Sequence, residues 1–265
     1  MENMTTTALT QQEAQWLESA RQMGREAGEV LKGYFRRRDL NIEDKGSAYD
    51  IVTEADKGSE RIIIGHIHDM YPQDAILSEE SGDDHRTAHC QWVIDPLDGT
   101  VNYSAGLATY CISIGLKVDG ETRMGYVYAP TLDEEFWAFK GKGAHGPNGL
   151  LQAKSTTELQ RAVISTGFPY DKATNADNNM DRFARVMPRV RGIRRLGSAA
   201  MDLCYVAAGW LDGYWELNLK EWDACAGELI ALEAGAVVKR YRNNHGICIL
   251  AACPGIAPAL FDLIE

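Results

Sequence analysis

Two aspartates, Asp95 and Asp98, have the spacing that best indicates chemistry in this sequence. The apolar residues 92–94 predict a strand that delivers Asp95 at its end, where functional side chains collect in loops. Pro96 restricts φ in the turn that follows, and this limits how far the two carboxylates can separate. They could share one hard cation or bridge two, with the carbonyl of Leu97 as a further oxygen ligand. An acidic surface turn with an aspartate as a helix N-cap would give the same short pattern.

The next two residues indicate an anion site. Gly99 lacks a Cβ, so the backbone N–H groups of Gly99 and Thr100 could approach an anion at the start of a helix. Two more acidic groups stand at expected element ends: Glu79 after the apolar pair 76–77, and Asp223 at a helix start. Each has an ordinary alternative, Glu79 as part of a solvated pair with Glu80, and Asp223 as an N-cap.

Taken together, five segments resemble the inositol monophosphatase family of Mg²⁺-dependent, lithium-sensitive phosphatases. They occur in the family's order over nearly the whole chain, so the resemblance is specific. The segments are DIVTEAD at 50–56, SEES at 78–81, WVIDPLDGTVNY at 92–103, GSAA at 197–200 and EWDACAG at 221–227. Tyr103 stands where the family often has Phe, and Ala236 where it often has a second Gly.

The resemblance implies a role for each matching position. Two Mg²⁺ ions would be held by Glu79, Asp95, the carbonyl of Leu97, Asp98 and Asp223, with Asp95 bridging. Thr100 and Asp56 would activate the attacking water. The phosphate and the rest of the substrate would contact Asp98, Gly99, Thr100, Gly197, Ser198, Ala199, Glu216 and Asp223. Every proposed ligand is an oxygen, as hard cations require. For Glu216, a role as a cross-strand polar residue is the alternative.

The expected function is therefore Mg²⁺-dependent hydrolysis of a phosphate monoester, with inositol monophosphate as the favoured substrate and two or three metals activating water. The alternatives are a fructose-1,6-bisphosphatase-like sugar phosphatase, a nucleotide 3′-phosphatase, and a non-catalytic binding protein of the same fold. The loop that begins at 167–170 could border the pocket. A basic run from Arg185 to Arg195 could be a solvated face, a dimer interface or a site for a second phosphate.

Hydrophobic periodicity predicts the elements that must position these residues. Helices are expected after a capping box at Thr10 and Glu13 and over 56–70, 177–187, 198–208 and 223–234. Strands are expected at 76–77, 92–94, 236–240 and 247–252, with an antiparallel meander over 110–139 turning at 119–120. Residues 45–56 read as a polar loop. The fold class is an α/β (α+β) layered sandwich that alternates helices with mixed or antiparallel sheets. An N-terminal subdomain, 1–150, would carry most metal ligands, and a C-terminal subdomain, 151–265, would complete the site.

The amino-acid composition limits the kinds of molecule that this protein is expected to bind. The 265 residues carry 38 acidic against 27 basic side chains, a net charge of −11, which argues against a nucleic-acid binder. The six cysteines form no C-x-x-C pair, so buried reduced thiols are expected rather than zinc or disulfides. The chain shows neither a signal-peptide pattern nor an apolar run long enough to span a bilayer. Together with the family resemblance, these features lead us to expect a cytoplasmic homodimer that acts on a small phosphate ester without membrane contact.

Overall fold

The computed structural model describes residues 8–37, 40–47, 50–242 and 246–265, and all structural statements concern these residues. The helices are α1 (Gln11–Tyr34), α2 (Glu54–Met70), α3 (Thr100–Ser104), α4 (Met180–Val186), α5 (Ala199–Ala207), α6 (Glu221–Glu233) and α7 (Ala257–Ile264). The strands are β1 (Glu43–Ser47), β2 (Asp50–Val52), β3 (Ala75–Ser78), β4 (Gly82–Asp83), β5 (Cys90–Asp98), β6 (Cys111–Val118), β7 (Glu121–Ala129), β8 (Glu134–Phe139), β9 (Ala144–Gly146), β10 (Gly149–Leu150), β11 (Val163–Thr166), β12 (Gly192–Arg194), β13 (Gly213–Leu219), β14 (Val237–Arg242) and β15 (Ile247–Ala252).

In the described chain the strands form two large sheets and one hairpin. The eight-stranded sheet has the order β10-β9-β8-β7-β6-β5-β3-β4, and within it only β3 and β5 run parallel. The five-stranded sheet has the order β12-β11-β13-β15-β14, with β11 parallel to both of its neighbours. The hairpin pairs β1 with β2.

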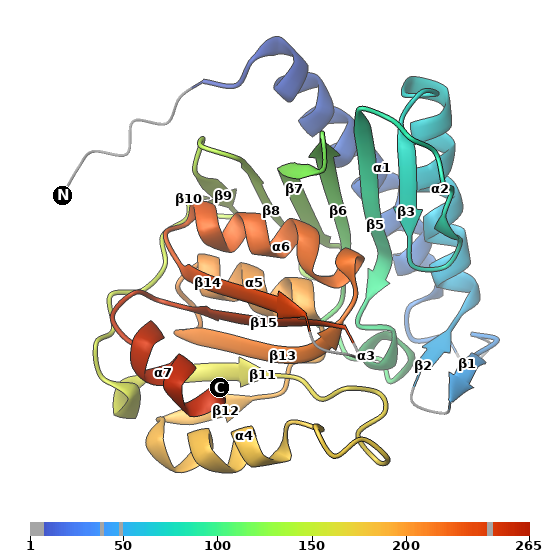
Figure 1. Ribbon diagram of the computed structural model, residues 1–265. Helices are drawn as coiled ribbons and strands as arrows, with labels where there is room; N and C mark the ends of the chain where they lie inside the picture. The colour runs from blue at the N-terminus through green and yellow to red at the C-terminus, as the bar shows by residue number, and fades with distance from the viewer. Residues whose placement is uncertain (1–7, 38–39, 48–49, 243–245) are drawn as a thin grey trace.

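Helices and sheets alternate in layers, as the sequence predicted (Figure 1). Helices α1 and α2 cover one face of the eight-stranded sheet, and α5 and α6 lie between the two sheets. Helices α4 and α7 cover the outer face of the five-stranded sheet. Buried apolar clusters fill the spaces between successive layers, for example around Trp92 under α1 and α2 and around Trp215 under α7. Burial of these apolar faces is the main force that holds the layers together.

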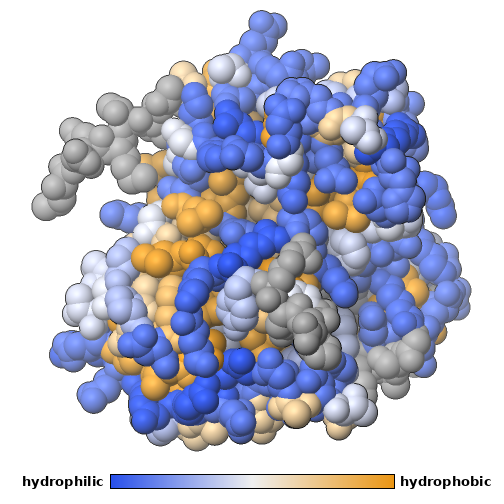
Figure 2. Space-filling model, viewed as in Figure 1, coloured by the Kyte–Doolittle hydropathy of each residue, from blue (hydrophilic) through white to orange (hydrophobic). Residues whose placement is uncertain are grey.

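Figure 2 shows one face of the molecule, which is largely hydrophilic. Apolar side chains gather left of centre, over the region that β10 and α6 occupy in Figure 1. Leu150 of β10 and Leu232 of α6 are among the exposed apolar residues. Among the described residues, no helix combines the length and apolar character needed to cross a lipid bilayer.

Several expected local features are confirmed. Thr10 and Glu13 form the capping box of α1: the backbone N–H of Glu13 donates to Thr10 Oγ1 at 3.2 Å, and that of Thr10 donates to Glu13 Oε2 at 2.8 Å. The meander over 110–139 is β6, β7 and β8, and both Asp119 and Gly120 in its first turn have positive φ. All six cysteines are free and buried.

Other expectations need correction. The segment around 45–56, read as a polar loop, forms the β1–β2 hairpin and then α2, which starts at Glu54 rather than Asp56. Helix α4 starts at Met180 instead of 177, because Asn179 has φ 74° and its side chain binds Thr166 and Trp215. Strands β11 and β12 and helix α7 did not stand out in the sequence, and β13 was considered only as an alternative setting for Glu216.

The expected boundary between residues 150 and 151 stays a prediction. The eight-stranded sheet draws its strands from residues before this point, and the five-stranded sheet draws its strands from residues after it. Just before this point, the short strands β9 and β10 form the edge of the first sheet.

Candidate active site

The only parallel pair in the described part of the first sheet brings two acidic residues to the same edge. Ser78, the last residue of β3, pairs with Ile94 of β5, so Glu79 and Asp95 are the next residues along each strand. The backbone N–H of Glu79 donates to the Ile94 carbonyl at 3.1 Å. Because both strands point the same way, the residues that follow the Ser78–Ile94 pair place both carboxylates in one pocket.

A bulge brings Asp98 to the same side. Asp95 pairs with Ser113 of β6, and Asp98 pairs with Cys111. The two pairs are three positions apart on β5 but only two positions apart on β6, so β5 contains one extra residue here. Without the extra residue, side chains an odd number of positions apart would point to opposite faces. Ser59 of α2 donates to the Pro96 carbonyl at 2.7 Å and fastens this irregular turn.

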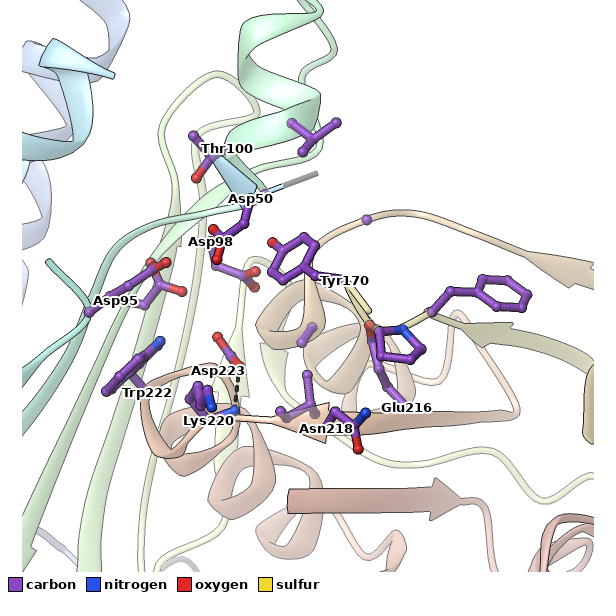
Figure 3. A pocket seen from close by; sticks show the side chains of 18 of the residues that line it. Asp50, Asp95, Asp98, Thr100, Tyr170, Glu216, Asn218, Lys220, Trp222 and Asp223 are labelled. Atoms are coloured by element: carbon purple, nitrogen blue, oxygen red, sulfur yellow. Dashed lines mark hydrogen bonds between the residues drawn. The ribbon is translucent and has the colours of Figure 1, made fainter. Parts of the chain in front are cut away.

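These residues line a cavity of about 380 Å³ between the ends of the two sheets. Figure 3 shows Asp95, Asp98 and Thr100 on one side, with Asp223 at the start of α6 and Glu216 on β13 across from them. Of the residues predicted from the sequence, the cavity wall includes Glu79, Asp95, Leu97, Asp98, Gly99, Thr100, Gly197, Ala199, Glu216 and Asp223. Asp56 and Ser198 lie behind this wall.

The carboxylates are held in an environment that disfavours their charge. Asp95 is 1% exposed, and burial together with the nearby charges of Glu79, Asp98 and Asp223 raises its pKa well above the ordinary value. Burial also raises the pKa of Asp98, to about 6, although Ser198 Oγ and the Ala200 N–H each donate to its Oδ2 at 2.7 Å. Asp223 accepts a hydrogen bond from the Lys220 N–H at 2.6 Å, and its pKa is raised well above the ordinary value by burial and by the charges of Glu79, Asp98 and Glu216.

The donor set fits a hard cation. Glu79 is the nearby charge that contributes most to the raised pKa of Asp95, and two neighbouring ionised carboxylates repel each other unless a proton or a cation lies between them. The metal ligands that this cavity offers are carboxylate oxygens and the Leu97 carbonyl oxygen, and oxygen is the ligand atom that Mg²⁺ prefers. In the described chain, no three Asp, Glu, His or Cys side chains already enclose a single metal position. Glu79 instead accepts from Lys45 Nζ at 2.8 Å, so binding a cation would require this side chain to adjust.

Thr100 and Asp56 are in contact, as the resemblance implied. Thr100, the first residue of α3, lies with its Oγ1 3.1 Å from Asp56 Oδ1 and 3.0 Å from the Leu97 carbonyl. Asp56 is buried in the first turn of α2, where the Thr53 hydroxyl donates to it at 2.5 Å. Burial raises the pKa of Asp56 to about 6, so it is a carboxylate at neutral pH and can accept a proton. Their roles in a reaction stay predictions.

The residues expected around the substrate divide into two groups. Ser198 is 2% exposed and donates to Asp98, so the structure places it as a support for that carboxylate. Gly197, with φ 88°, and Ala199 face the cavity. Glu216 faces it from β13: its carboxylate accepts from the Tyr214 hydroxyl at 2.7 Å, and burial raises its pKa to about 7. Substrate contact by these groups stays a prediction.

Four polar residues of the cavity wall were given no role from the sequence: Lys45, Asp50, Asn218 and Lys220. Lys45 binds both Glu79 and Glu80, the latter at 2.6 Å. The pairing of β1 with β2 is the structural reason that Lys45 reaches the pocket, and the alternating pattern that would reveal this hairpin is absent from its polar sequence. The loop expected to border the pocket does so through Phe168, Pro169 and Tyr170.

The arginines of the basic run from Arg185 to Arg195 lie in different environments. Arg185 donates to the Leu263 carbonyl at 2.7 Å and so anchors the end of α7. Arg191 and Arg194 are exposed, while Arg195 lines the cavity. A dimer interface in this run stays a prediction.

Comparisons with known proteins agree with this geometry. The model of the inositol monophosphatase family matches residues 12–260. The Nus factor SuhB of Pasteurella multocida is 40% identical over 91% of this chain and 92% of its own length. The Nus factor SuhB of Escherichia coli K12 is 37% identical over 89% of this chain and 90% of its own.

Solved structures show the same similarity. The inositol monophosphatase from Anabaena (Nostoc) sp. PCC 7120 superposes with a TM-score of 0.83 at 35% identity, over 94% of this chain and 95% of that one. The IMPase of Thermotoga maritima superposes with a TM-score of 0.85 at 31% identity, over 94% and 96% of the two chains.

Proposed function

The chain belongs to the inositol monophosphatase family, and from this membership and the pocket geometry we propose that it hydrolyses phosphate monoesters with Mg²⁺, inositol monophosphate being the favoured substrate. The observation that carries the proposal is the meeting of Glu79, Asp95, Asp98 and Asp223 in one cavity, with Thr100 and Asp56 in contact at its edge. The first group would bind the cations, and the second would handle the proton of the attacking water.

Metal binding would explain why four acidic side chains are grouped in the cavity. Grouped carboxylates that are buried beside one another are unfavourable unless a cation neutralises them. Glu79, Asp95, Asp98, Asp223 and the Leu97 carbonyl would hold Mg²⁺. When bound, Mg²⁺ neutralises phosphate charge, lowers the pKa of water and stabilises the leaving oxygen.

The chain's own residues supply the proton path and the orientation of the substrate. The Thr100 hydroxyl can accept the proton of an attacking water while donating its own to Asp56, because its Oγ1 is 3.1 Å from Asp56 Oδ1. On the other side of the cavity, the Glu216 carboxylate can accept hydrogen bonds from substrate hydroxyls. A phosphate at one end and an acceptor carboxylate at the other suit a phosphorylated polyol.

A panel of phosphate esters tests this proposal. Inositol 1-phosphate, fructose 1,6-bisphosphate and a nucleoside 3′-phosphate would be assayed with Mg²⁺, with and without millimolar Li⁺. We expect the highest kcat/KM for inositol phosphate and inhibition by Li⁺. A preference for the bisphosphate or the nucleotide would support one of the two alternative substrates, and inactivity on all three would favour the non-catalytic alternative.

A second candidate role comes from the names of the relatives. The chain is 37–40% identical to proteins named Nus factor SuhB over about nine-tenths of both chains. Replacing the Escherichia coli relative with this chain, as wild type and as Asp95→Asn, would test whether it serves in that capacity. Replacement by both forms would show a Nus-factor role that does not need the proposed catalysis. Replacement by neither would argue against that role, and the expectation of no nucleic-acid partner would stand as a prediction.

A further inference from the structure

A loop from Gly167 to Asn179 holds one wall of the cavity in place. At its end, Asn179 is 1% exposed and donates to Thr166 Oγ1 at 2.9 Å and to the Gly167 carbonyl at 2.6 Å. The Trp215 indole donates to Asn179 Oδ1 at 2.6 Å, which ties the loop to β13. These buried bonds join both ends of the loop to the five-stranded sheet.

The middle of the loop is also fastened. Asp171 accepts from Asn175 Nδ2 at 2.9 Å and from Asn218 Nδ2 at 3.5 Å, and Asn218 belongs to β13. The ring of Phe168 packs against Phe183 of α4 with 5.9 Å between centroids. Tyr170 stands between Phe168 and Asp171, so its position over the cavity is set by contacts on both sides.

The Tyr170 ring extends over the cavity with its hydroxyl toward Asp98 and Asp50 (Figure 3). The residue is 53% exposed, so one side of the ring meets solvent while the other forms the wall. A tyrosine phenol ionises only at about pH 10, so this hydroxyl is a neutral hydrogen-bond donor at physiological pH.

We propose that Tyr170 is a substrate-binding residue whose hydroxyl donates a hydrogen bond to a phosphate oxygen of the bound ester. The inference rests on the proposed function and deepens it. The hydroxyl faces the acidic cluster that would hold the cations, and a dianionic phosphate bound there brings acceptor oxygens to the same end of the cavity. A phenol suits this place better than a cation would, because a lysine or arginine would pair with the carboxylates as Lys45 already pairs with Glu79.

Inorganic phosphate is the probe, because it contains the recognised group and nothing else. Calorimetry would measure its dissociation constant at saturating Mg²⁺ for wild type, Tyr170→Phe and Tyr170→Leu, beside KM and kcat for inositol 1-phosphate. Tyr71→Phe is the matched control: its phenol bonds Ser19 at 2.8 Å at the far end of α2 from Asp56. Thermal unfolding would confirm that each variant folds.

We expect Tyr170→Phe to raise both the phosphate dissociation constant and KM by about 10- to 100-fold. This is the loss of affinity expected when one hydrogen bond to a charged group is removed. The value of kcat should change little, since the contact forms before the chemical step. Tyr71→Phe should match wild type. If Tyr170→Phe also matched wild type, with or without a loss in Tyr170→Leu, the hydroxyl would have no such role and the inference would fail.

The two proposals can fail separately. Weaker phosphate binding by Tyr170→Phe in a protein that hydrolyses none of the esters would support Tyr170 and overturn the phosphatase activity. If the protein is an active phosphatase but Tyr170→Phe binds phosphate as tightly as wild type, the phosphatase activity would be supported and the role of Tyr170 overturned. A wild-type protein that binds no phosphate with Mg²⁺ would overturn both.

Discussion

The Thr100 hydroxyl sits between two acceptors, Asp56 Oδ1 and the Leu97 carbonyl, and its single proton can go to only one of them. If the proposed relay operates, Thr100→Ala and Asp56→Asn should each lower kcat by about 10²–10⁴-fold, the usual loss when general-base assistance is removed. Thr100→Ser keeps the hydroxyl and should retain much of the activity. Steady-state kcat at saturating Mg²⁺ for each variant is the measurement.

The double variant decides whether the two residues act as one unit. Thr100→Ala with Asp56→Asn should lose little more than either single variant, because a relay is already broken when one member is absent. Losses that multiply would mean independent roles, and the relay would have to be abandoned. Mg²⁺ binding by calorimetry should be nearly unchanged in Thr100→Ala, which separates a proton-transfer defect from a metal defect.

Glu216 gives a pH dependence at the opposite end of the cavity. The groups that face it are the Tyr214 hydroxyl, Arg195 and Asp98, and the net effect, led by burial, raises its pKa to about 7. Below that pH the protonated acid loses acceptor capacity, and above it the carboxylate can accept two hydroxyl hydrogen bonds. KM for inositol phosphate should therefore fall as pH rises through about 7.

The controls for this prediction are a Glu216→Gln variant and a second substrate. Glu216→Gln should keep KM high and remove the inflection near pH 7. A phosphate ester without neighbouring hydroxyls should show no such inflection in either protein. The same inflection in Glu216→Gln would assign it to another group.

At the scale of elements, α6 must lie close to the eight-stranded sheet for Asp223 to reach the cavity. A Cβ on Gly125 of β7 would stand 2.5 Å from the Ala226 carbonyl oxygen of α6, a backbone atom that cannot turn aside. Gly125→Ala should therefore push α6 outward and lower the free energy of unfolding by about 1–3 kcal/mol or more. Its Mg²⁺ affinity should weaken as well, because Asp223 moves with the helix.

Gly65→Ala is the matched variant for this prediction. Gly65 lies in α2, and a Cβ added there would point into open space, with no contact within 4 Å beyond the backbone of its own helix. The substitution should stabilise the protein by about 0.5–1 kcal/mol through helix propensity and leave Mg²⁺ binding unchanged. Denaturant unfolding and calorimetry measure both quantities, and equal effects of the two substitutions would show that α6 packing is not critical.

The elements also show what the sequence could and could not predict. Local signals sufficed for α1, where a capping box precedes a regular apolar spacing, and for the existence of strand β5. The strand was expected to deliver Asp95 at its end, but it continues through a bulge to Asp98. The approach of Lys45 to Glu79, 34 residues away, depends on how the β1–β2 hairpin sits against the sheet, which no local pattern encodes. Likewise, no local pattern encodes the hydrogen bond from the Ser198 hydroxyl to Asp98, which lies 100 residues away in the sequence.

At the scale of the whole molecule, the cavity exists only where both sheets meet. The first sheet supplies Glu79, Asp95 and Asp98, and the second half of the chain supplies Glu216 and Asp223. Neither set alone contains all the proposed ligands of Mg²⁺. A cation held by both would link the two halves, so its binding should stabilise the entire fold.

This linkage gives the last prediction. Wild-type stability should rise with Mg²⁺ concentration, by about 2.7 kcal/mol at 100 times the dissociation constant. Asp95→Asn keeps the oxygen that accepts the Leu97 N–H at 2.9 Å but removes the charge nearest the centre of the cluster. Without Mg²⁺ the variant should be at least as stable as wild type, since repulsion by Glu79, Asp98 and Asp223 is relieved. With Mg²⁺ it should gain little stability and show almost no activity. Thermal unfolding across a Mg²⁺ titration measures this, with Asp262→Asn on the exposed face of α7 as the charge-matched control. That control should behave as wild type, and an Asp95→Asn protein that is stabilised by Mg²⁺ as strongly as the control would remove Asp95 from the proposed metal site.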